Sequence, residues 1–181
     1  MAAQNFAQCL QAFWSFDGFK NDTAPGEKFR TAFGVTEMTW ANAVEQGIVE
    51  GGLNQGTEAD FEKILHVLYW DVCKCDEMPD GVDLMLFNDA TLSGSGHTTR
   101  LLQRTVGTTQ DGIIGNMTFD AIYAINPNYL ITRLSVADEH YLASLRNAYL
   151  YLRGWTRRET FMRDLALKMS DASLPSLPTN G

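Results

Sequence analysis

The sequence LLQRTVG at residues 101–107, followed by QDGIIG at residues 110–115, decides much of the fold. The apolar residues of the first segment fall on one helical face, and Gly107 follows where a left-handed residue can end a helix. Asp111-Gly112 is a turn dipeptide. A second apolar helical face begins over residues 118–123. The stretch therefore predicts two helices joined by a tight turn, a pattern that also suits an ordinary helical packing unit.

Apolar residues recur at helical spacing along most of the remaining chain, which indicates a mainly α protein. A first helix should end near Gly18. Residues 18–36 are rich in Gly, Asn, Asp and Thr and should form an irregular loop or a short β-hairpin. The pattern Thr57-x-x-Asp60 resembles a capping box that opens the next helix. Residues 82–92 are apolar on several sides and are predicted to form a buried central helix.

The C-terminal third is predicted to contain two helices and a tail. Pro127 suits the first turn of a long helix that runs to about Leu152. Gly154-Trp155 should break this helix, and the capping box over residues 156–159 should open the last one. Residues 170–181 contain two prolines amid Ser, Thr and Asn, so we expect a flexible tail.

Composition and charge limit the classes of function. With 181 residues, 45% of them hydrophobic and 20% charged, the chain is one globular domain or two small ones. The net charge of -8 argues against nucleic-acid binding and against loose attraction to an anionic cell wall. The C-terminal helices are locally basic, which predicts a solvated face or a docking surface for an acidic partner. Apolar stretches are too short to span a membrane.

The cysteines and the N-terminus give further expectations. An odd number of cysteines (Cys9, Cys73 and Cys75) argues against a disulfide framework. Neither a second cysteine pair nor a nearby histidine completes a zinc site, so we expect reduced thiols, no metal and no cofactor. Residues 1–14 carry no basic residue ahead of their apolar stretch. We therefore expect no secretory signal and synthesis in the host cytoplasm.

Several landmarks of the sequence occur in a characteristic order. They are FDGFKND at residues 16–22, FGVT at 33–36, YWD at 69–71, MLFNDA at 85–90, the segment at 101–115 and RGWTRR at 153–158. This ordered set resembles glycoside hydrolase family 108, a lysozyme-like family of phage and bacterial N-acetylmuramidases with a fused peptidoglycan-binding segment. The resemblance covers roughly residues 4–169.

The resemblance implies both an architecture and an activity. It implies a lysozyme-like helical domain with a short irregular or β-hairpin lobe over residues 1–94, and a helical peptidoglycan-binding-like segment over residues 95–169. Residues 170–181 remain as the tail. The activity it implies is hydrolysis of the β-1,4 bond between N-acetylmuramic acid and N-acetylglucosamine in the glycan strands of peptidoglycan. Such enzymes are commonly endolysins or wall-remodelling proteins of phages and prophages.

The family's catalytic motif departs from its usual form in this chain. The family carries Glu-Gly-Gly-aromatic at the end of its first helix, whereas this chain reads FDGF at residues 16–19. Aligning glycine to glycine puts Phe16 in the place of the glutamate. Allowing a one-residue deletion puts Asp17 there and keeps the distance to Thr31. The motif-like EGG at residues 50–52 lies in a glycine-rich loop before the second major helix, which is the wrong place.

The family motif and the chemistry of glycoside cleavage give the candidate site. Asp17 is the candidate proton donor, because a helix C-terminus and neighbouring aromatic rings disfavour its charged form. Glu27 and Asp22 are candidates for the second carboxylate, and Thr31 could position a water. Candidates for substrate binding are Phe19, Tyr69, Asn88, Asp89, Ser93, His97 and Asp111. Each candidate also has an ordinary structural interpretation as a helix end, core, surface or turn residue.

Two functions follow from these residues. The first is a working muramidase that acts at the bacterial cell wall. The second is a catalytically decayed family member that serves as a structural or wall-binding component of a phage particle. In that case the basic C-terminal helices and the tail would contact other virion proteins. The missing glutamate favours the second function, as do Asn88, where the family has an acid, and Leu92, where it has a polar groove residue.

Overall fold

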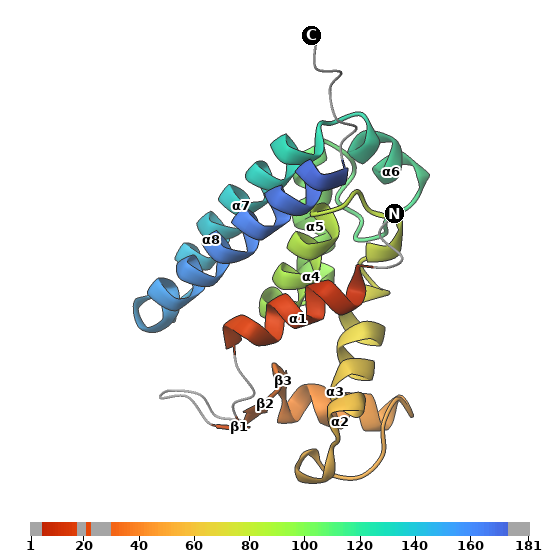
Figure 1. Cartoon of the computed structure of the whole chain (residues 1–181), viewed down its shortest axis with the longest axis vertical. Coiled ribbons are helices and arrows are strands. Elements are labelled where there is room, and N and C mark those ends of the chain that lie inside the picture. Colours follow the sequence, from red (N-terminus) through yellow and green to blue (C-terminus); the bar gives the residue numbers. More distant parts are fainter. Residues whose placement is uncertain (1–4, 18–20, 23–29, 174–181) are drawn as a thin grey trace, which may run out of the picture.

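Helices form most of the computed structural model, which describes residues 5–17, 21–22 and 30–173 (Figure 1). This confirms the mainly α, lysozyme-like fold. In chain order the elements are α1 (Phe6–Asp17), β1 (Asn21–Asp22), β2 (Thr31–Ala32), β3 (Val35–Thr36), α2 (Glu37–Glu45), the 3-10 turn η2 (Leu53–Gln55), α3 (Glu58–Leu65), the π-helical turn η3 (His66–Trp70), the 3-10 turn η4 (Cys75–Glu77), α4 (Val82–Ser93), α5 (Ser95–Val106), α6 (Asn116–Tyr123), α7 (Pro127–Ser144) and α8 (Ala148–Ser173).

The central element is α4, as its continuous apolar sequence predicts. Every residue from Val82 to Ala90 is buried, because α1, α5, α7 and α8 surround this helix. Gly94 alone separates α4 from α5, with a φ of 85°. At the other end of α5, Gly107 takes the left-handed conformation (φ 79°) expected of a helix stop. These four neighbours and α4 form the larger, helical lobe (Figure 1).

The boundary between the last two helices differs from the sequence-based prediction. The helix α7 ends at Ser144 and α8 begins at Ala148, so the predicted break at Gly154-Trp155 is wrong. Leu145 leaves the helix with an extended backbone (ψ 142°), although the turn contains neither glycine nor proline. Gly154 stays helical because one glycine costs a helix only about 1 kcal/mol, and the packing of α8 on α4 and α7 outweighs that cost.

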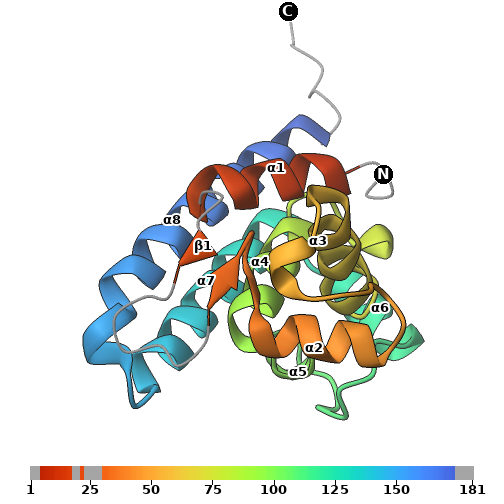
Figure 2. The same cartoon turned by 90° about the horizontal axis from the view of Figure 1, so that it is seen from below.

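A smaller lobe lies beneath α1 and contains a short antiparallel sheet, α2 and α3 (Figures 1 and 2). The strand order is β1-β2-β3. This sheet is the β-hairpin alternative predicted for residues 18–36, within the described part. Thr36 caps α2 through a hydrogen bond from the Thr39 amide (3.1 Å). The capping box of Thr57 and Asp60 forms as predicted at the start of α3.

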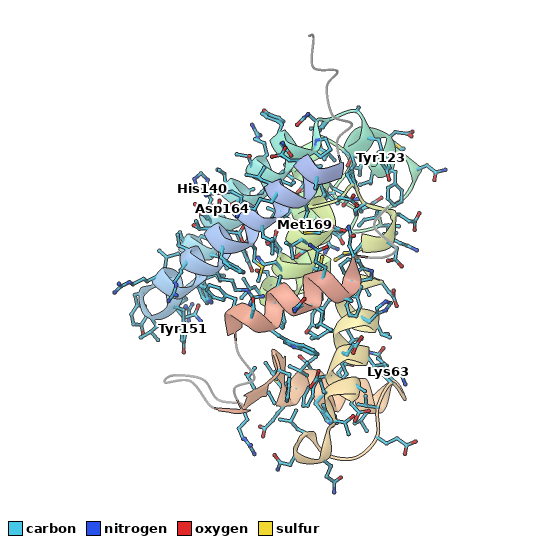
Figure 3. The ribbon with its side chains drawn as sticks, in the orientation of Figure 1. Lys63, Tyr123, His140, Tyr151, Asp164 and Met169 are labelled. Atoms are coloured by element: carbon cyan, nitrogen blue, oxygen red, sulfur yellow. The ribbon has the colours of Figure 1, made fainter. Side chains whose placement is uncertain are left out.

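Side chains fill the spaces between these elements (Figure 3), from Lys63 on the smaller lobe to Tyr151 near the turn that joins α7 and α8. All three cysteines are buried and free. Burial raises the pKa of the Cys73 thiol to about 12, so that thiol stays protonated at neutral pH. Over the described residues, the helices are too short or too polar to cross a bilayer.

Candidate functional site

The C-terminal end of α1 is fixed to the sheet by aromatic packing. The indole of Trp14 donates a hydrogen bond to the Phe33 carbonyl (3.3 Å), and the Phe33 ring stacks on Phe61 of α3 with centroids 4.7 Å apart. Phe33 and Gly34 form the two-residue turn between β2 and β3, both with positive φ (50° and 80°), as a type I′ hairpin requires. A positive φ at phenylalanine is strained, and the hydrogen bond to the Phe33 carbonyl and the stacking of its ring on Phe61 hold it there.

The candidate catalytic residues belong to this junction as far as the structure describes them. Asp17 is the last residue of α1, one turn beyond Phe13, whose ring covers Gly34. Thr31 lies in β2, directly opposite Asp22 of β1 in the sheet register. The two other candidates from this region, Phe19 and Glu27, lie outside the described residues.

Two grooves flank α1. A groove of about 460 Å³ lies between α1 and α3, and it is lined by Ala7, Leu10, Gln11, Trp14, Ser15, Glu58 and Glu62. A second groove, of about 430 Å³, lies between α1 and α8, and it is lined by Ser15, Phe16, Gly154, Arg157 and Phe161. The second groove reaches the last turn of α1, so it adjoins the position of Asp17. Asp17 directly follows Phe16, which lines this groove.

Asn88 and Asp89 lie in the interior of the helical lobe and are fully buried. The Asn88 carboxamide accepts a hydrogen bond from Arg158 Nε (2.7 Å) and donates one to Glu159 Oε2 (2.9 Å). Arg158 also donates to the Thr91 hydroxyl (2.7 Å). The structure therefore places these two candidates in a polar network that joins α4 to α8, away from any surface that a glycan reaches.

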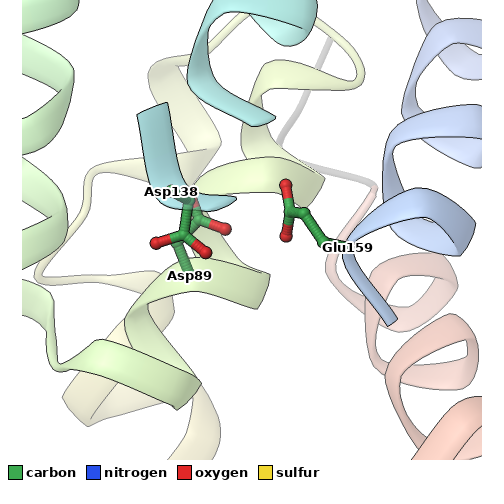
Figure 4. A group of neighbouring side chains, drawn as sticks. All are labelled: Asp89, Asp138 and Glu159. Carbon is green, nitrogen blue, oxygen red and sulfur yellow. The ribbon is translucent and has the colours of Figure 1, made fainter. Parts of the chain in front are cut away.

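Three carboxylates from three helices meet at this network: Asp89 of α4, Asp138 of α7 and Glu159 of α8 (Figure 4). Burial raises the pKa of Glu159 to about 8 and that of Asp138 to about 6, and the neighbouring carboxylates add to the shift at Glu159. Burial and the same neighbours hold the pKa of Asp89 well above its usual range. At neutral pH the cluster therefore retains protons, and Arg158 offsets part of the remaining negative charge.

The three carboxylates are also the group of described residues that could hold a metal ion, since their ligand atoms lie within 4.8 Å of one another. A cation would have to displace the protons that burial favours. One sequence pattern points to this cluster. Asp138 lies four residues from both Leu134 and Leu142, which are buried on the inner face of α7, so a charge at that position marks a buried acid.

The candidates near α5 have mainly structural partners. His97 stacks on Tyr141 with centroids 3.7 Å apart, and burial lowers its pKa. Ser93 is the last residue of α4, and its hydroxyl is buried. Tyr69 is half-buried against the core in the π-helical turn η3. These contacts join His97 to α7 and Tyr69 to the core.

Asp111 belongs to the turn that opens α6. The buried amide of Gln103 donates to Asp111 Oδ1 (2.7 Å) and to the Ile113 carbonyl (3.0 Å), and it accepts from the Gly112 amide (2.9 Å). The backbone amide of Ile113 and the Gln103 amide lower the pKa of Asp111. This residue also lines an open groove of about 470 Å³ beside the exposed side chain of Met117. The glutamine and the Asp-Gly pair are thus one structural unit.

Sequence reasoning missed the side chains that α8 contributes. Arg157 and Phe161 line the groove beside α1, while Arg158 and Glu159 are buried. The basic C-terminal face is therefore smaller than the sequence suggests, because Arg158 points inward. The expected helix break at Gly154 hid this arrangement, since the helical phase of residues 157–161 depends on one continuous α8.

A helical lobe and a small sheet lobe that meet across α1 define a lysozyme-like helical protein. Two sequence families match consecutive parts of the chain: glycosyl hydrolase 108 over residues 18–94, and a family described as a predicted peptidoglycan domain over residues 97–160. The chain is therefore similar to glycosyl hydrolase 108 in its first part and to a peptidoglycan domain in the part that follows, and the two matches support a peptidoglycan-targeting, lysozyme-like protein.

A solved structure supports the same conclusion about the fold. The chain resembles Brucella abortus SagA with a TM-score of 0.82 and 28% sequence identity, over 93% of this chain and 97% of that one. Comparison with curated proteins finds no match.

Proposed function

We propose that this protein hydrolyses the β-1,4 bond between N-acetylmuramic acid and N-acetylglucosamine, with Asp17 as the proton donor. The observation that carries the proposal is the position of Asp17. It is the acidic residue of α1, and it ends that helix where α1 meets the β2–β3 turn and the groove against α8. In a glycosidase the donor must reach the leaving oxygen of a strand bound in such a groove.

The surroundings of this helix end suit an acid that must stay protonated. A helix C-terminus disfavours a negative charge, and the aromatic side chains of Trp14 and Phe16 precede Asp17 in α1. The second carboxylate would come from Asp22 or Glu27, or Thr31 would position a water in its place. Aspartate is one methylene shorter than glutamate, and a misplacement of about 1 Å costs roughly a hundredfold in rate. We therefore expect a slow enzyme.

Release of reducing ends from purified peptidoglycan tests this proposal. We expect slow release by the wild-type protein and loss of release in Asp17→Asn. Asp17→Glu restores the missing methylene and should keep or raise the rate. Asp120→Asn, an exposed substitution on α6, is the matched control and should cleave like the wild type. Turnover by Asp17→Asn at the wild-type rate would exclude Asp17 as the donor.

A second candidate function is wall binding without turnover, as a structural part of a phage particle. The packing of Phe16 favours it. The Phe16 ring lies 5.5 Å from that of Phe161, under the guanidinium of Arg157, so an apolar contact occupies the position that one alignment gives to the family's glutamate. A Phe16→Glu variant that lyses cell walls, beside an inactive wild type, would support this function. Co-purification with assembled particles would support virion partners bound through the basic face and the tail.

The division of labour along the chain is part of the proposal. We assign glycan cleavage to residues 1–94, a peptidoglycan-binding role to residues 95–169 and contacts with partners to residues 170–181. The two family matches support the first boundary, because one ends at residue 94 and the other begins at residue 97. The proposed place of action is the bacterial cell wall, or a phage particle for the second function.

A further inference from the structure

Gly154 is an unexpected residue for its position. It lies within α8, the longest helix of the described chain, at an exposed site where glycine is less favourable than alanine by about 1 kcal/mol. A Cβ atom built on Gly154 meets no other atom within 4 Å, and its backbone φ is not in the left-handed region. Neither close packing nor backbone conformation therefore requires a glycine here.

The position of Gly154 coincides with a groove. It lines the groove of about 430 Å³ between α1 and α8, and Arg157 and Phe161 line the same groove from the following turns of α8. These three residues are spaced three and four apart, so they share one face of the helix. A side chain at position 154 would extend into the space that they border.

The remaining lining residues give the groove its chemistry. The rings of Phe16 and Phe161 lie 5.5 Å apart at an angle of 36°, and 41% of Phe161 is exposed. The guanidinium carbon of Arg157 lies 5.8 Å from the centre of the Phe16 ring. Aromatic faces suit the apolar face of a sugar ring, and an arginine suits a carboxylate. A groove of this kind fits a sugar that carries an acid.

We propose that this groove binds a muramic acid residue of the glycan strand, with the sugar on the Phe161 ring and its lactyl carboxylate on Arg157. The inference rests on the proposed function, because a strand cleaved at Asp17 would extend along the neighbouring Phe16, which lines this groove. Charge supports the assignment. Arg157 is exposed and lines the groove, so it can pair with the carboxylate of muramic acid, whereas N-acetylglucosamine has no charge to offer it.

The binding test uses tetrasaccharides and the full chain. Affinities are measured by calorimetry in the Asp17→Asn background, so that cleavage does not consume the ligand. The ligands are a GlcNAc–MurNAc tetrasaccharide with free lactyl carboxylates, the same glycan with stem peptides, and chitotetraose, which has no carboxylate. We expect Arg157→Gln to weaken binding of the first glycan about tenfold or more, since it removes a charged hydrogen bond, and to leave chitotetraose unchanged. Arg153→Gln, one turn earlier on α8 and outside the groove, is the matched control and should change neither.

Filling the groove tests the role of the glycine separately. Gly154→Leu should weaken binding of the GlcNAc–MurNAc tetrasaccharide and of chitotetraose at least tenfold. Thr156→Leu, at an exposed neighbouring site of α8 outside the groove, should leave both affinities unchanged. Circular dichroism and the Tm confirm that each variant is folded. Unchanged affinities in both Arg157→Gln and Gly154→Leu would overturn the proposal. An effect of Arg157→Gln confined to the stem-bearing glycan would overturn it too, because the arginine would then bind a peptide carboxylate.

The outcomes separate this inference from the proposed function. Suppose that the wild-type protein releases no reducing ends, and that Arg157→Gln weakens binding of the carboxylated glycan. The catalytic role of Asp17 is then wrong, and the muramic acid site stands. If Asp17→Asn abolishes cleavage while the groove variants bind like their parent, the catalytic proposal stands and the groove assignment is wrong.

Discussion

Asn88 and Glu159, 71 positions apart in the sequence, are joined by a hydrogen bond of 2.9 Å in the centre of the helical lobe. The Asn88 amide donates to Glu159, while its carbonyl oxygen accepts from Arg158. An asparagine can serve both neighbours because its side chain is donor and acceptor at once. A carboxylate at position 88 could accept from the arginine but could donate nothing to the glutamate unless it were protonated. The asparagine at position 88 is therefore fitted to this network.

The first prediction concerns that fit. Asn88→Asp places a further carboxylate beside Glu159 in a fully buried site, which should lower the free energy of unfolding by about 2–4 kcal/mol at neutral pH. The loss should be smaller at pH 5, where the new acid can be protonated. Urea unfolding at both pH values measures the effect. The matched control is Asn42→Asp on the exposed face of α2, which should stay within about 0.5 kcal/mol. An equally small effect at position 88 would show that Arg158 alone satisfies the site.

The second prediction concerns pH. The pKa of Glu159 is raised to about 8 and that of Asp138 to about 6, above the values near 4 of carboxyls in an unfolded chain. Between these limits the folded protein holds protons that the unfolded chain has lost. The free energy of unfolding should therefore fall as the pH rises from about 5 to 8. Each pKa unit corresponds to about 1.4 kcal/mol, so we expect a fall of about 2 kcal/mol or more.

Glu159→Gln isolates the contribution of the cluster to that fall. The glutamine has no acid to ionise, so the variant should lose less stability than the wild type over the same interval. The comparison is needed because His97, whose pKa is lowered, changes stability in the opposite direction over part of this range. Glu45→Gln on the surface of α2 should behave like the wild type. A steep gain in Tm on adding Ca²⁺ at pH 8 would contradict proton retention and indicate that the carboxylates bind a cation.

The elements that the sequence predicts well are those with a local signal. The continuous apolar run of α4 requires burial on all sides, and the structure surrounds it with four helices. At Thr57 a local side-chain hydrogen bond starts α3, and at Gly107 a positive φ ends α5. Both signals lie within a few residues of the helix end, so the sequence predicts them. The Gly154-Trp155 break failed for the converse reason. Glycine only weakens a helix, and contacts from distant elements decided that α8 continues.

The candidate site shows where such local reasoning stops. Arg157 and Arg158 are adjacent in the sequence, yet one lines an open groove and the other bonds Asn88 in the core. Composition cannot separate the two arginines, because they differ only in the direction in which consecutive residues of a helix point. That direction cannot be assigned while the predicted start of the helix is wrong. The sequence pattern predicts that Glu159 caps the start of a helix, and this prediction is wrong for the same reason, because Glu159 lies within α8. The position of Asp17 at the end of α1, by contrast, follows from the apolar spacing of the first helix.

The third prediction concerns the turn between α5 and α6. Gln103→Glu keeps the acceptor for the Gly112 amide but replaces the donor that faces Asp111 and the Ile113 carbonyl. Two bonds are lost and two carboxylates are brought together, so we expect a loss of about 2–3 kcal/mol in the free energy of unfolding. Gln46→Glu changes a glutamine that bonds an exposed asparagine on α2 and should cost less than about 0.5 kcal/mol. Hydrogen exchange should speed up at the Ile113 amide, which donates a hydrogen bond to Asp111. Unchanged exchange there would show that the turn holds without the glutamine.

The last prediction concerns the junction that positions Asp17. Gly34 and Gly47 both have positive φ, 80° and 70°, but a Cβ at Gly34 would overlap the ring of Phe13, whereas a Cβ at Gly47 meets nothing within 4 Å. Gly47→Ala should therefore cost only the backbone strain, about 1 kcal/mol. Gly34→Ala should cost about 1–3 kcal/mol more, since the core must also move.

The same pair of variants tests whether this contact matters for catalysis. In Gly34→Ala the β2–β3 turn and the end of α1 must separate, so the release of reducing ends should fall well below that of Gly47→Ala at a temperature where both are folded. Chemical denaturation gives the stability of each variant, and the rate of reducing-end release gives the activity. Equal stability and equal rates in the two variants would mean that the Phe13 ring yields without moving α1. The geometry of the candidate proton donor would then have to be fixed from the α8 side, through the Phe16–Phe161 contact.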